Sequence, residues 1–237
     1  MKRIILMVIL SIFNLPYWII RLNQLGNIKK YDAETRYAFL HRVTPIVIRR
    51  GRIKILCSGL ENLPGENGYI MFPNHQGLFD ALAFLETHKR PFVTVMKKEV
   101  KNVIILKQVI RILQAEIIDR EDIRQSMQVI MNMTRRVKEG DNFIIFAEGT
   151  RSRDGNNLLD FKGGSFKSAM NARCPIVPVA LIDSYKAFDT NSIKKLTVQI
   201  RYMKPLNYED YQGMKSTEIA ELVSSLIKQE IAMYSQP

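Results

Sequence analysis

The segment Asn74–Asp80 contains the residues whose types and spacing are best suited to proton transfer. It places His75, one of only three histidines, five residues before Asp80. Five residues turn a continuous α-helix through about 500°, so the two side chains meet only if His75 lies in a loop and Asp80 in the first turn of the following helix. The carboxylate would then hold one imidazole nitrogen and leave the other as a base. No serine or cysteine stands beside the pair as a nucleophile, which favours activation of a hydroxyl group carried by a substrate.

A purely structural role for the same two residues is also open. Asp80 could be a first-turn acid that is favoured by the unpaired N–H groups and the positive end of a helix. His75 could be a loop histidine held by a backbone carbonyl. The His-x4-Asp spacing alone does not separate these two interpretations.

A second segment has the composition of an anion-binding loop. The apolar run 142–146 predicts a buried parallel strand, and Ala147–Gly155 follows it directly. Loops at the carboxyl ends of such strands are where α/β folds place ligands. Gly149 permits close backbone approach, Thr150 offers a hydroxyl, and Arg151 can bind a phosphate with two hydrogen bonds. The alternative is an exposed, charged turn.

With both segments present, the chain resembles the glycerolipid acyltransferase family. His75 to Asp80 looks like the His-x4-Asp motif of that family, and Phe146–Ser152 matches its Phe-x-Glu-Gly-Thr-Arg-Ser segment. Ile117–Arg120 resembles the second motif and Ile176–Val179 the fourth. The four motifs occur in family order within roughly residues 50–205.

Two positions depart from the family pattern. The glycine that usually opens the second motif is absent, and the stretch reads Gln114-Ala115-Glu116. Gly77 stands where many relatives carry a serine.

The resemblance implies roles for the residues in its motifs, and position in the sequence suggests Lys162 and the oxyanion candidates. His75 is the general base and Asp80 orients it. Arg120 and Arg151 are implied in binding the acceptor's phosphate, together with the loop residues Glu148, Gly149 and Thr150. Lys162, before a predicted helix start, is a further anion contact. The candidates for stabilising the tetrahedral oxyanion are Gly77, Lys97 and Lys98.

The implied reaction is transfer of an acyl chain from a thioester to the sn-2 hydroxyl of 1-acyl-sn-glycerol 3-phosphate, giving phosphatidic acid. The donor is acyl-CoA or acyl carrier protein, and the sequence does not choose between them. Another lysophospholipid or glycerol 3-phosphate could be the acceptor. A thioester hydrolase could use the same His–Asp pair to activate water. A non-catalytic membrane adaptor is a further alternative, but it would not need the pair.

Composition fits one globular chain without a metal or a bound cofactor. The 237 residues are 46% hydrophobic and 24% charged, as in ordinary soluble domains. Cys57 and Cys174 are far apart, so reduced thiols are expected. The sequence has no clustered metal ligands, no dinucleotide-binding glycine motif and no Walker A sequence.

The basic residues are concentrated near the N-terminus. The net charge is +12, and residues 1–54 carry eleven Lys or Arg against two acids. Such an end suits an anionic surface, either nucleic acid or phospholipid. Residues 4–20 are almost wholly apolar and end with Tyr17 and Trp18, which favour the membrane interface. We therefore expect membrane phospholipids, and no nucleic acid, as the partner.

The apolar segment has several possible structures. It lacks a small-residue cleavage site of a signal peptide, and 17 residues is the lower limit for a membrane span. A buried core helix is the structural alternative. We expect a helix that lies in the cytoplasmic leaflet, which gives a peripheral or monotopic protein on the cytoplasmic face of the cell membrane. With a second helix over 33–50, it resembles an N-terminal membrane-associating hairpin.

Beyond residue 51, strand and helix signals alternate. This pattern predicts an α/β fold with a mostly parallel sheet flanked by helices, in a catalytic domain over 51–237 that follows the N-terminal helices of 1–50. We expect strands at 52–57, 69–72, 91–96, 116–118, 142–146, 176–181 and 196–202. We expect helices at 80–87, 102–113, 122–138, 163–172 and 216–234.

Overall fold

The computed structural model describes residues 1–98, 104–119 and 121–235. Its centre is a seven-stranded sheet in the order β1-β7-β6-β2-β5-β3-β4. Among the described strands, β6 and β7 form the one antiparallel pair. The expected mostly parallel α/β sheet is therefore confirmed. The strands are β1 Ile53–Ser58, β2 Ile70–Pro73, β3 Val93–Lys97, β4 Glu116–Ile118, β5 Phe143–Ile144, β6 Ile176–Ile182 and β7 Leu196–Tyr202.

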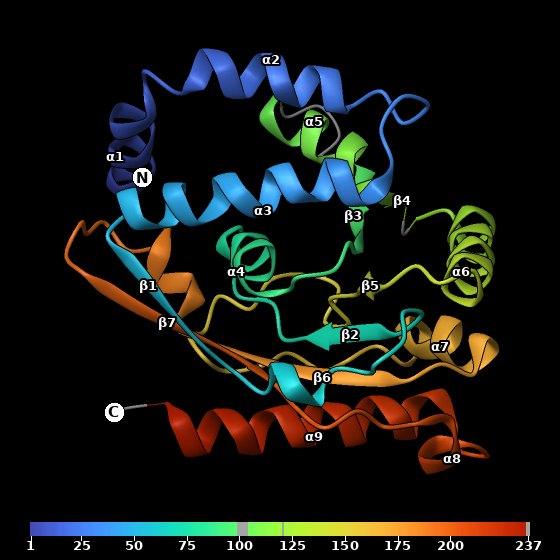
Figure 1. Ribbon diagram of the computed structural model, residues 1–237. Coiled ribbons are helices and arrows are strands. Elements are labelled where there is room, and N and C mark those ends of the chain that lie inside the picture. The colour runs from blue at the N-terminus through green and yellow to red at the C-terminus, as the bar shows by residue number, and fades with distance from the viewer. Residues whose placement is uncertain (99–103, 120, 236–237) are drawn as a thin grey trace.

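Helices cover both faces of the sheet (Figure 1). One face carries α1 Lys2–Ser11, α2 Leu15–Leu25, α3 Ala33–Arg50, α4 Phe79–Thr87 and α5 Ile104–Leu113. The other carries α6 Ile123–Lys138, α7 Lys167–Ala172 and α9 Ser216–Tyr234. The short elements are η1 Leu60–Asn62, η3 Gly163–Phe166, η4 Ser184–Ala187 and α8 Tyr208–Tyr211.

Strand β2 lies in the middle of the sheet because it is apolar on both sides. Ile70 and Phe72 pack into the core beneath α6, α7 and α9, whereas Met71 packs into the core beneath the N-terminal helices. All three side chains are fully buried. Alternate residues of a strand point to opposite faces, so a run without a polar residue is stable only where helices cover both faces. The loop that leaves β2 therefore starts from a rigid position.

The apolar N-terminal segment is two helices and not one. The chain turns at residues 12–14, and the axes of α1 and α2 are bent by 91°. Pro16 lies in the first turn of α2, where its missing N–H cannot continue the hydrogen bonding of a preceding helix. Within the described residues, no single helix is both long and apolar enough to cross a membrane, although α1 and α2 meet that length and composition together.

These N-terminal helices pack against the rest of the chain. Met7, Leu25 and Tyr37 belong to the same buried cluster as residues of β2 and α4. Arg3 is only 2% exposed, and its guanidinium donates to the carbonyls of Gly51, Ala187 and Lys194 at 2.6, 3.1 and 3.0 Å. The segments 1–50 and 51–237 thus share one core.

Two other elements are shorter than the sequence predicts. Strand β5 has two residues where five were expected, at 142–146. The expected helix over 163–172 is the 3₁₀ turn η3 followed by α7, and a side chain at Gly163 would meet the backbone of Thr217 at 3.0 Å. Close packing against α9 therefore fixes this glycine. The expected helix over 102–113 begins within the described residues at Ile104, and positions 102–103 lie outside them.

Candidate active site

The candidate site residues gather at the carboxyl edge of the parallel strands. His75 follows β2, the loop from Ala147 follows β5, and Asp183 with Ser184 follows β6. Strand β2 pairs with β5 on one side and with β6 on the other, in both cases parallel. The three loops therefore leave the sheet side by side, where open α/β sheets place their ligands.

His75 and Asp80 have the arrangement that their spacing predicts. His75 lies in the loop, Asp80 lies in the first turn of α4, and 2.7 Å separate His75 Nδ1 from Asp80 Oδ2. Asp80 is fully buried, whereas the His75 side chain is 25% exposed. Nε2 of His75 has no hydrogen-bond partner among the residues that the structure describes. One nitrogen is thus held and the other is available as a base.

The Asp80 carboxylate is surrounded by donors. Besides His75, the backbone N–H groups of Gln76 and Gly77 donate to Oδ2 at 2.8 and 3.0 Å. The hydroxyl of Ser184 donates to Oδ1. A fully buried carboxylate is stable in its charged form only with such donors. One carboxylate thus fixes both the loop and the imidazole, which is compatible with either interpretation of Asp80.

The backbone of His75 is held by the second loop. Its N–H donates to Glu148 Oε1 at 2.6 Å, and its carbonyl accepts from the Ser152 N–H at 2.8 Å. The ring of Phe146 lies against the imidazole, with 4.2 Å between ring centroids. These contacts fix the imidazole from the strand β5 side.

Glu148 has no free oxygen for a ligand. Its second oxygen, Oε2, accepts the backbone N–H of Leu159 at 2.9 Å, and the residue is 2% exposed. Burial raises the pKa of the Glu148 carboxyl above its usual value, while the donated N–H groups of His75 and Leu159 oppose that shift. Gly149, with φ of +79°, makes the turn that directs Glu148 inward. The structure therefore places Glu148 as a support of the His75 loop.

Of the residues expected to bind phosphate, Arg151 is the best placed. It is partly exposed, follows the Glu148 turn, and pairs with Asp189 at 3.1 Å. Thr150 and Lys162 are exposed on the same loop region. Arg120 lies outside the described residues.

The three oxyanion candidates differ in what they already bind. The N–H of Gly77 donates to Asp80. The ammonium of Lys98 pairs with Asp119 at 2.8 Å. Lys97, at the end of β3, is exposed, and its ammonium has no recorded partner in the described part of the chain.

Two site residues were missed by the sequence analysis. Ser184 donates to the Asp80 carboxylate, and the side-chain oxygen of Gln76 accepts the N–H groups of Ser184 and Tyr185 at 2.7 and 3.3 Å. A signal for Ser184 was present, since Asp183 and Ser184 are polar residues directly after a buried strand. What the sequence does not reveal is that β6 lies beside β2.

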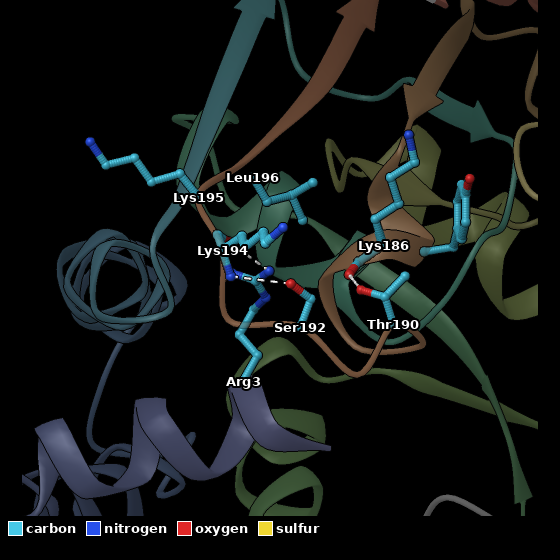
Figure 2. A pocket seen from close by; sticks show the side chains of 8 residues that line it. Arg3, Lys186, Thr190, Ser192, Lys194, Lys195 and Leu196 are labelled. Atoms are coloured by element: carbon cyan, nitrogen blue, oxygen red, sulfur yellow. Dashed lines mark hydrogen bonds between the residues drawn. The ribbon is translucent and has the colours of Figure 1, made fainter. Parts of the chain in front are cut away.

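A separate pocket of about 260 Å³ lies on the other side of η4, where α1 meets the start of β7. Figure 2 shows Arg3 rising from α1 into this region beside Lys194 and Ser192. None of the candidate site residues lines it. Its lining consists of Arg3, Tyr185, Lys186, Thr190, Ser192, Lys194, Lys195 and Leu196.

Comparison with known proteins gives the class of this chain. Residues 54–182, more than half of its length, match the family model described as Acyltransferase. This range contains the His75–Asp80 pair, the Glu148 loop and strand β6. The chain belongs to the acyltransferase family and is an enzyme of that class.

Individual relatives carry more specific names than the family model does. A probable 1-acyl-sn-glycerol-3-phosphate acyltransferase of Mycoplasma genitalium is 26% identical over 211 residues, which cover 83% of this chain and 78% of the relative. The 1-acyl-sn-glycerol-3-phosphate acyltransferase of Borreliella burgdorferi is 32% identical over 141 residues, 60% of this chain and 56% of the relative. In fold, the chain is similar to the crystal structure of the 1-acyl-sn-glycerophosphate acyltransferase PlsC of Thermotoga maritima. The TM-score is 0.77 at 18% identity, over 100% of this chain and 96% of the other.

Proposed function

We propose that this protein transfers an acyl chain from a thioester to the sn-2 hydroxyl of 1-acyl-sn-glycerol 3-phosphate, and so makes phosphatidic acid. The observation that carries the proposal is the held Nδ1 of His75, 2.7 Å from Asp80, together with a partly exposed ring whose Nε2 is available. In the described residues, no serine or cysteine side chain bonds Nε2. The hydroxyl that His75 activates must then come from a substrate. The names of the relatives supply the identity of that substrate.

The proposed reaction has two steps, formation and collapse of a tetrahedral oxyanion. Nε2 of His75 takes the proton of the acceptor hydroxyl as that oxygen bonds to the thioester carbonyl carbon, which gives a tetrahedral oxyanion. The oxyanion then collapses, the carbon–sulfur bond breaks, and the imidazolium returns the proton to the thiolate. Asp80 holds the tautomer and stabilises the imidazolium, as the acid of a Ser-His-Asp triad does. The base supplies about 10²–10⁴-fold, so positioning of the substrates supplies much of the rest.

The acceptor phosphate is assigned to Arg151, with Thr150 and Lys162 as neighbours. In the free protein Arg151 pairs with Asp189. Both side chains of that pair are more than a third exposed, and such pairs contribute little. A phosphate dianion can therefore displace Asp189 and bind the guanidinium with two hydrogen bonds. Arg120 is assigned to the same phosphate from the family resemblance.

For the oxyanion, Lys97 is the most available of the three candidates. Gly77 and Lys98 already donate to Asp80 and Asp119. The single backbone N–H of Gly77 would have to leave Asp80 before it could bind an oxyanion, and Lys98 would have to share its ammonium with Asp119.

We further propose that the protein works at the cytoplasmic face of the cell membrane as a peripheral or monotopic enzyme. Helices α1 and α2 leave a continuous set of large apolar side chains in contact with solvent, which supports an interfacial position over a buried helix. Exposed cations Lys29, Lys30, Arg42 and Arg49 lie on the same N-terminal segment and would attract anionic head groups. The exposed apolar residues are Ile5, Val8, Ile9, Leu10, Ile12, Phe13, Tyr17, Ile19 and Ile20.

The test is product analysis with a labelled acyl donor. Purified protein is given acyl-CoA or acyl carrier protein loaded with the same chain, with and without 1-acyl-sn-glycerol 3-phosphate in mixed micelles. We expect labelled phosphatidic acid only when the acceptor is present, with at least one of the donors. Glycerol 3-phosphate and other lysophospholipids serve as competing acceptors.

A matched histidine variant separates the site from general effects. His75→Ala should abolish transfer, whereas His41→Gln, on helix α3 and bonded to Leu85, should retain it. Free fatty acid released equally well without acceptor would identify a hydrolase. Faster transfer to another acceptor would reassign the substrate, and absence of any product would reject the proposed reaction.

A further inference from the structure

We infer that Ser184 is a positioning residue for the reaction, which fixes the orientation of Asp80 and through it the imidazole of His75. The inference rests on the proposed function of the His75–Asp80 pair and adds a third member to it. Ser184 is the first residue of η4, 104 positions from Asp80 in the sequence, and its hydroxyl donates to Asp80 Oδ1.

The two oxygens of Asp80 are not equivalent. Oδ2 accepts from His75 and from the N–H groups of Gln76 and Gly77. Oδ1 has the Ser184 hydroxyl as its one recorded donor in the described structure. Both oxygens lie off the Cβ–Cγ bond, so any rotation about that bond moves Oδ1 and Oδ2 together. The bond from Ser184 to Oδ1 adds a second fixed point that resists this rotation, and so helps to fix the direction in which Oδ2 meets Nδ1.

Ser184 is itself held in place by a closed ring of hydrogen bonds. Its N–H donates to the side-chain oxygen of Gln76 at 2.7 Å, and the N–H of Gln76 donates to Asp80 at 2.8 Å. Exposure of the three residues is 0, 1 and 0% for Ser184, Gln76 and Asp80. Hydrogen bonds in such a buried site are strong and mutually supporting.

The ring is extended towards solvent by Asn156. The side-chain nitrogen of Gln76 donates to Asn156 Oδ1 at 2.8 Å, and the same oxygen accepts the N–H of Asp183 at 2.8 Å. Asn156 thus holds both Gln76 and the residue before Ser184. The hydroxyl of Ser184 is therefore aimed by backbone contacts on each side of it, which is the construction expected of a supporting residue in a preorganised site.

Three serine variants test the inference. Ser184→Ala removes the donor. Ser184→Cys fills the same space with a thiol, which is a weak donor. Ser168→Ala is the matched control, because Ser168 is equally buried on α7 and its hydroxyl has no hydrogen-bond partner among the described residues. Each variant is assayed for kcat and for both KM values, with folding checked by thermal unfolding.

We expect Ser184→Ala to lower kcat by about 10- to 100-fold, the loss that an unpaired buried polar group produces. The KM values for donor and acceptor should change less than about twofold, since Ser184 touches neither substrate. Ser184→Cys should also be impaired, and Ser168→Ala should match the unchanged protein. If Ser184 only filled space, the Cys variant would be as active as the unchanged protein.

A spectroscopic readout does not depend on turnover. With ¹⁵N-labelled histidine, the Nδ1 proton of His75 should give a downfield signal that His75→Ala removes, which is simple to assign with three histidines in the chain. Ser184→Ala should shift this signal, and Ser168→Ala should leave it in place.

The inference is overturned if the folded Ser184→Ala protein retains more than half of the kcat and the signal does not move. This outcome is distinct from failure of the proposed function, in which the unchanged protein makes no acceptor-dependent product.

Discussion

Glu148 accepts the backbone N–H of His75 at 2.6 Å, so the carboxylate of one sequence motif holds the proposed base of another, 73 positions away. Both Glu148 oxygens are used by backbone N–H groups, of His75 and of Leu159. The loop after β5 therefore has two separate tasks. Its buried acid holds the loop after β2, and its partly exposed Arg151, paired with Asp189, is the residue proposed to bind the acceptor phosphate.

The first prediction concerns Glu148. Glu148→Gln replaces one acceptor oxygen by an NH₂ group that faces a backbone N–H, so we expect kcat to fall by about tenfold or more and the acceptor KM to change little. The control is Glu66→Gln, at an exposed position. Steady-state kinetics with both substrates varied is the measurement. A rise confined to the acceptor KM would instead make Glu148 a substrate ligand.

The second prediction concerns the base. His75→Ala should lower kcat by about 10³-fold or more, because proton removal is its task. Asp80→Asn should be similarly impaired, because an amide does not select the tautomer of His75. Membrane binding and thermal unfolding should be unchanged for His75→Ala. Retention of more than a tenth of the activity by that variant would remove His75 from the mechanism.

The third prediction separates acceptor binding from chemistry through Arg151 and its partner. Arg151→Ala should raise the acceptor KM by about 10- to 150-fold, the range of one charged hydrogen bond, and leave the donor KM alone. Asp189→Asn should lower the acceptor KM by up to about fivefold, because it releases Arg151 from an exposed pair. Substrate titrations of both variants decide this. If Asp189→Asn raised the acceptor KM instead, Asp189 would itself contact the acceptor.

The fourth prediction concerns membrane binding by α1 and the following turn. Phe13 is 96% exposed, so Phe13→Asp should weaken co-sedimentation with anionic vesicles by about tenfold or more while the unfolding temperature stays the same. Met131→Asp, at an exposed site on α6, is the control. Added salt should weaken the binding of the unchanged protein to anionic vesicles more than to neutral ones. Equal binding by the Phe13 and Met131 variants would place the membrane surface elsewhere.

A substitution tests this surface better than a truncation does. Arg3 and Met7 are buried against the rest of the chain, so removing the N-terminal segment would expose the core and remove the anchor at once. Phe13 has no such structural task.

The fifth prediction concerns stability and pH. Burial lowers the pKa of His88 from its ordinary 6.5 to about 4. The folded state therefore favours neutral His88, and this contribution is complete above pH 6.5 and is lost as the pH falls through 4. Between these values the unfolding free energy should fall by roughly 3 kcal/mol more in the unchanged protein than in His88→Gln. Urea unfolding across this range measures it, and parallel curves for the two proteins would contradict it.

The sequence was sufficient for features that depend on local spacing. The His75–Asp80 contact follows from a five-residue separation across the start of one helix, and the alternation of apolar strands and helices was enough for the parallel sheet. Helix α9 begins and ends at the predicted residues, 216 and 234, because its apolar stripe is regular throughout.

Features that depend on strand order could not be predicted. Ser184 meets Asp80 because β6 lies beside β2, although β3, β4 and β5 come between them in the chain. No residue pattern within either strand specifies that neighbour.

The backbone conformation of Gln114 is a second kind of feature that could not be predicted from the sequence. It stands where the family motif has glycine, and its φ of +49° is the left-handed conformation that glycine adopts without strain. Its side chain accepts a hydrogen bond from the buried Arg36 at 2.9 Å, and this contact lies far from it in the sequence. In this chain Gln114 thus adopts a left-handed conformation although it is not a glycine.

The three carbonyls bound by Arg3 have a consequence for how the enzyme meets a lipid. They belong to the end of α3, to η4 beside Ser184, and to the segment before β7, so outward movement of α1 would break three hydrogen bonds of a buried guanidinium. With the membrane placement proposed above, α1 reaches the leaflet while it is docked against the rest of the fold. The distance of His75 from the membrane surface is then set by the fold. In the proposed reaction it is the lysophospholipid that has to move partly out of the leaflet to reach His75.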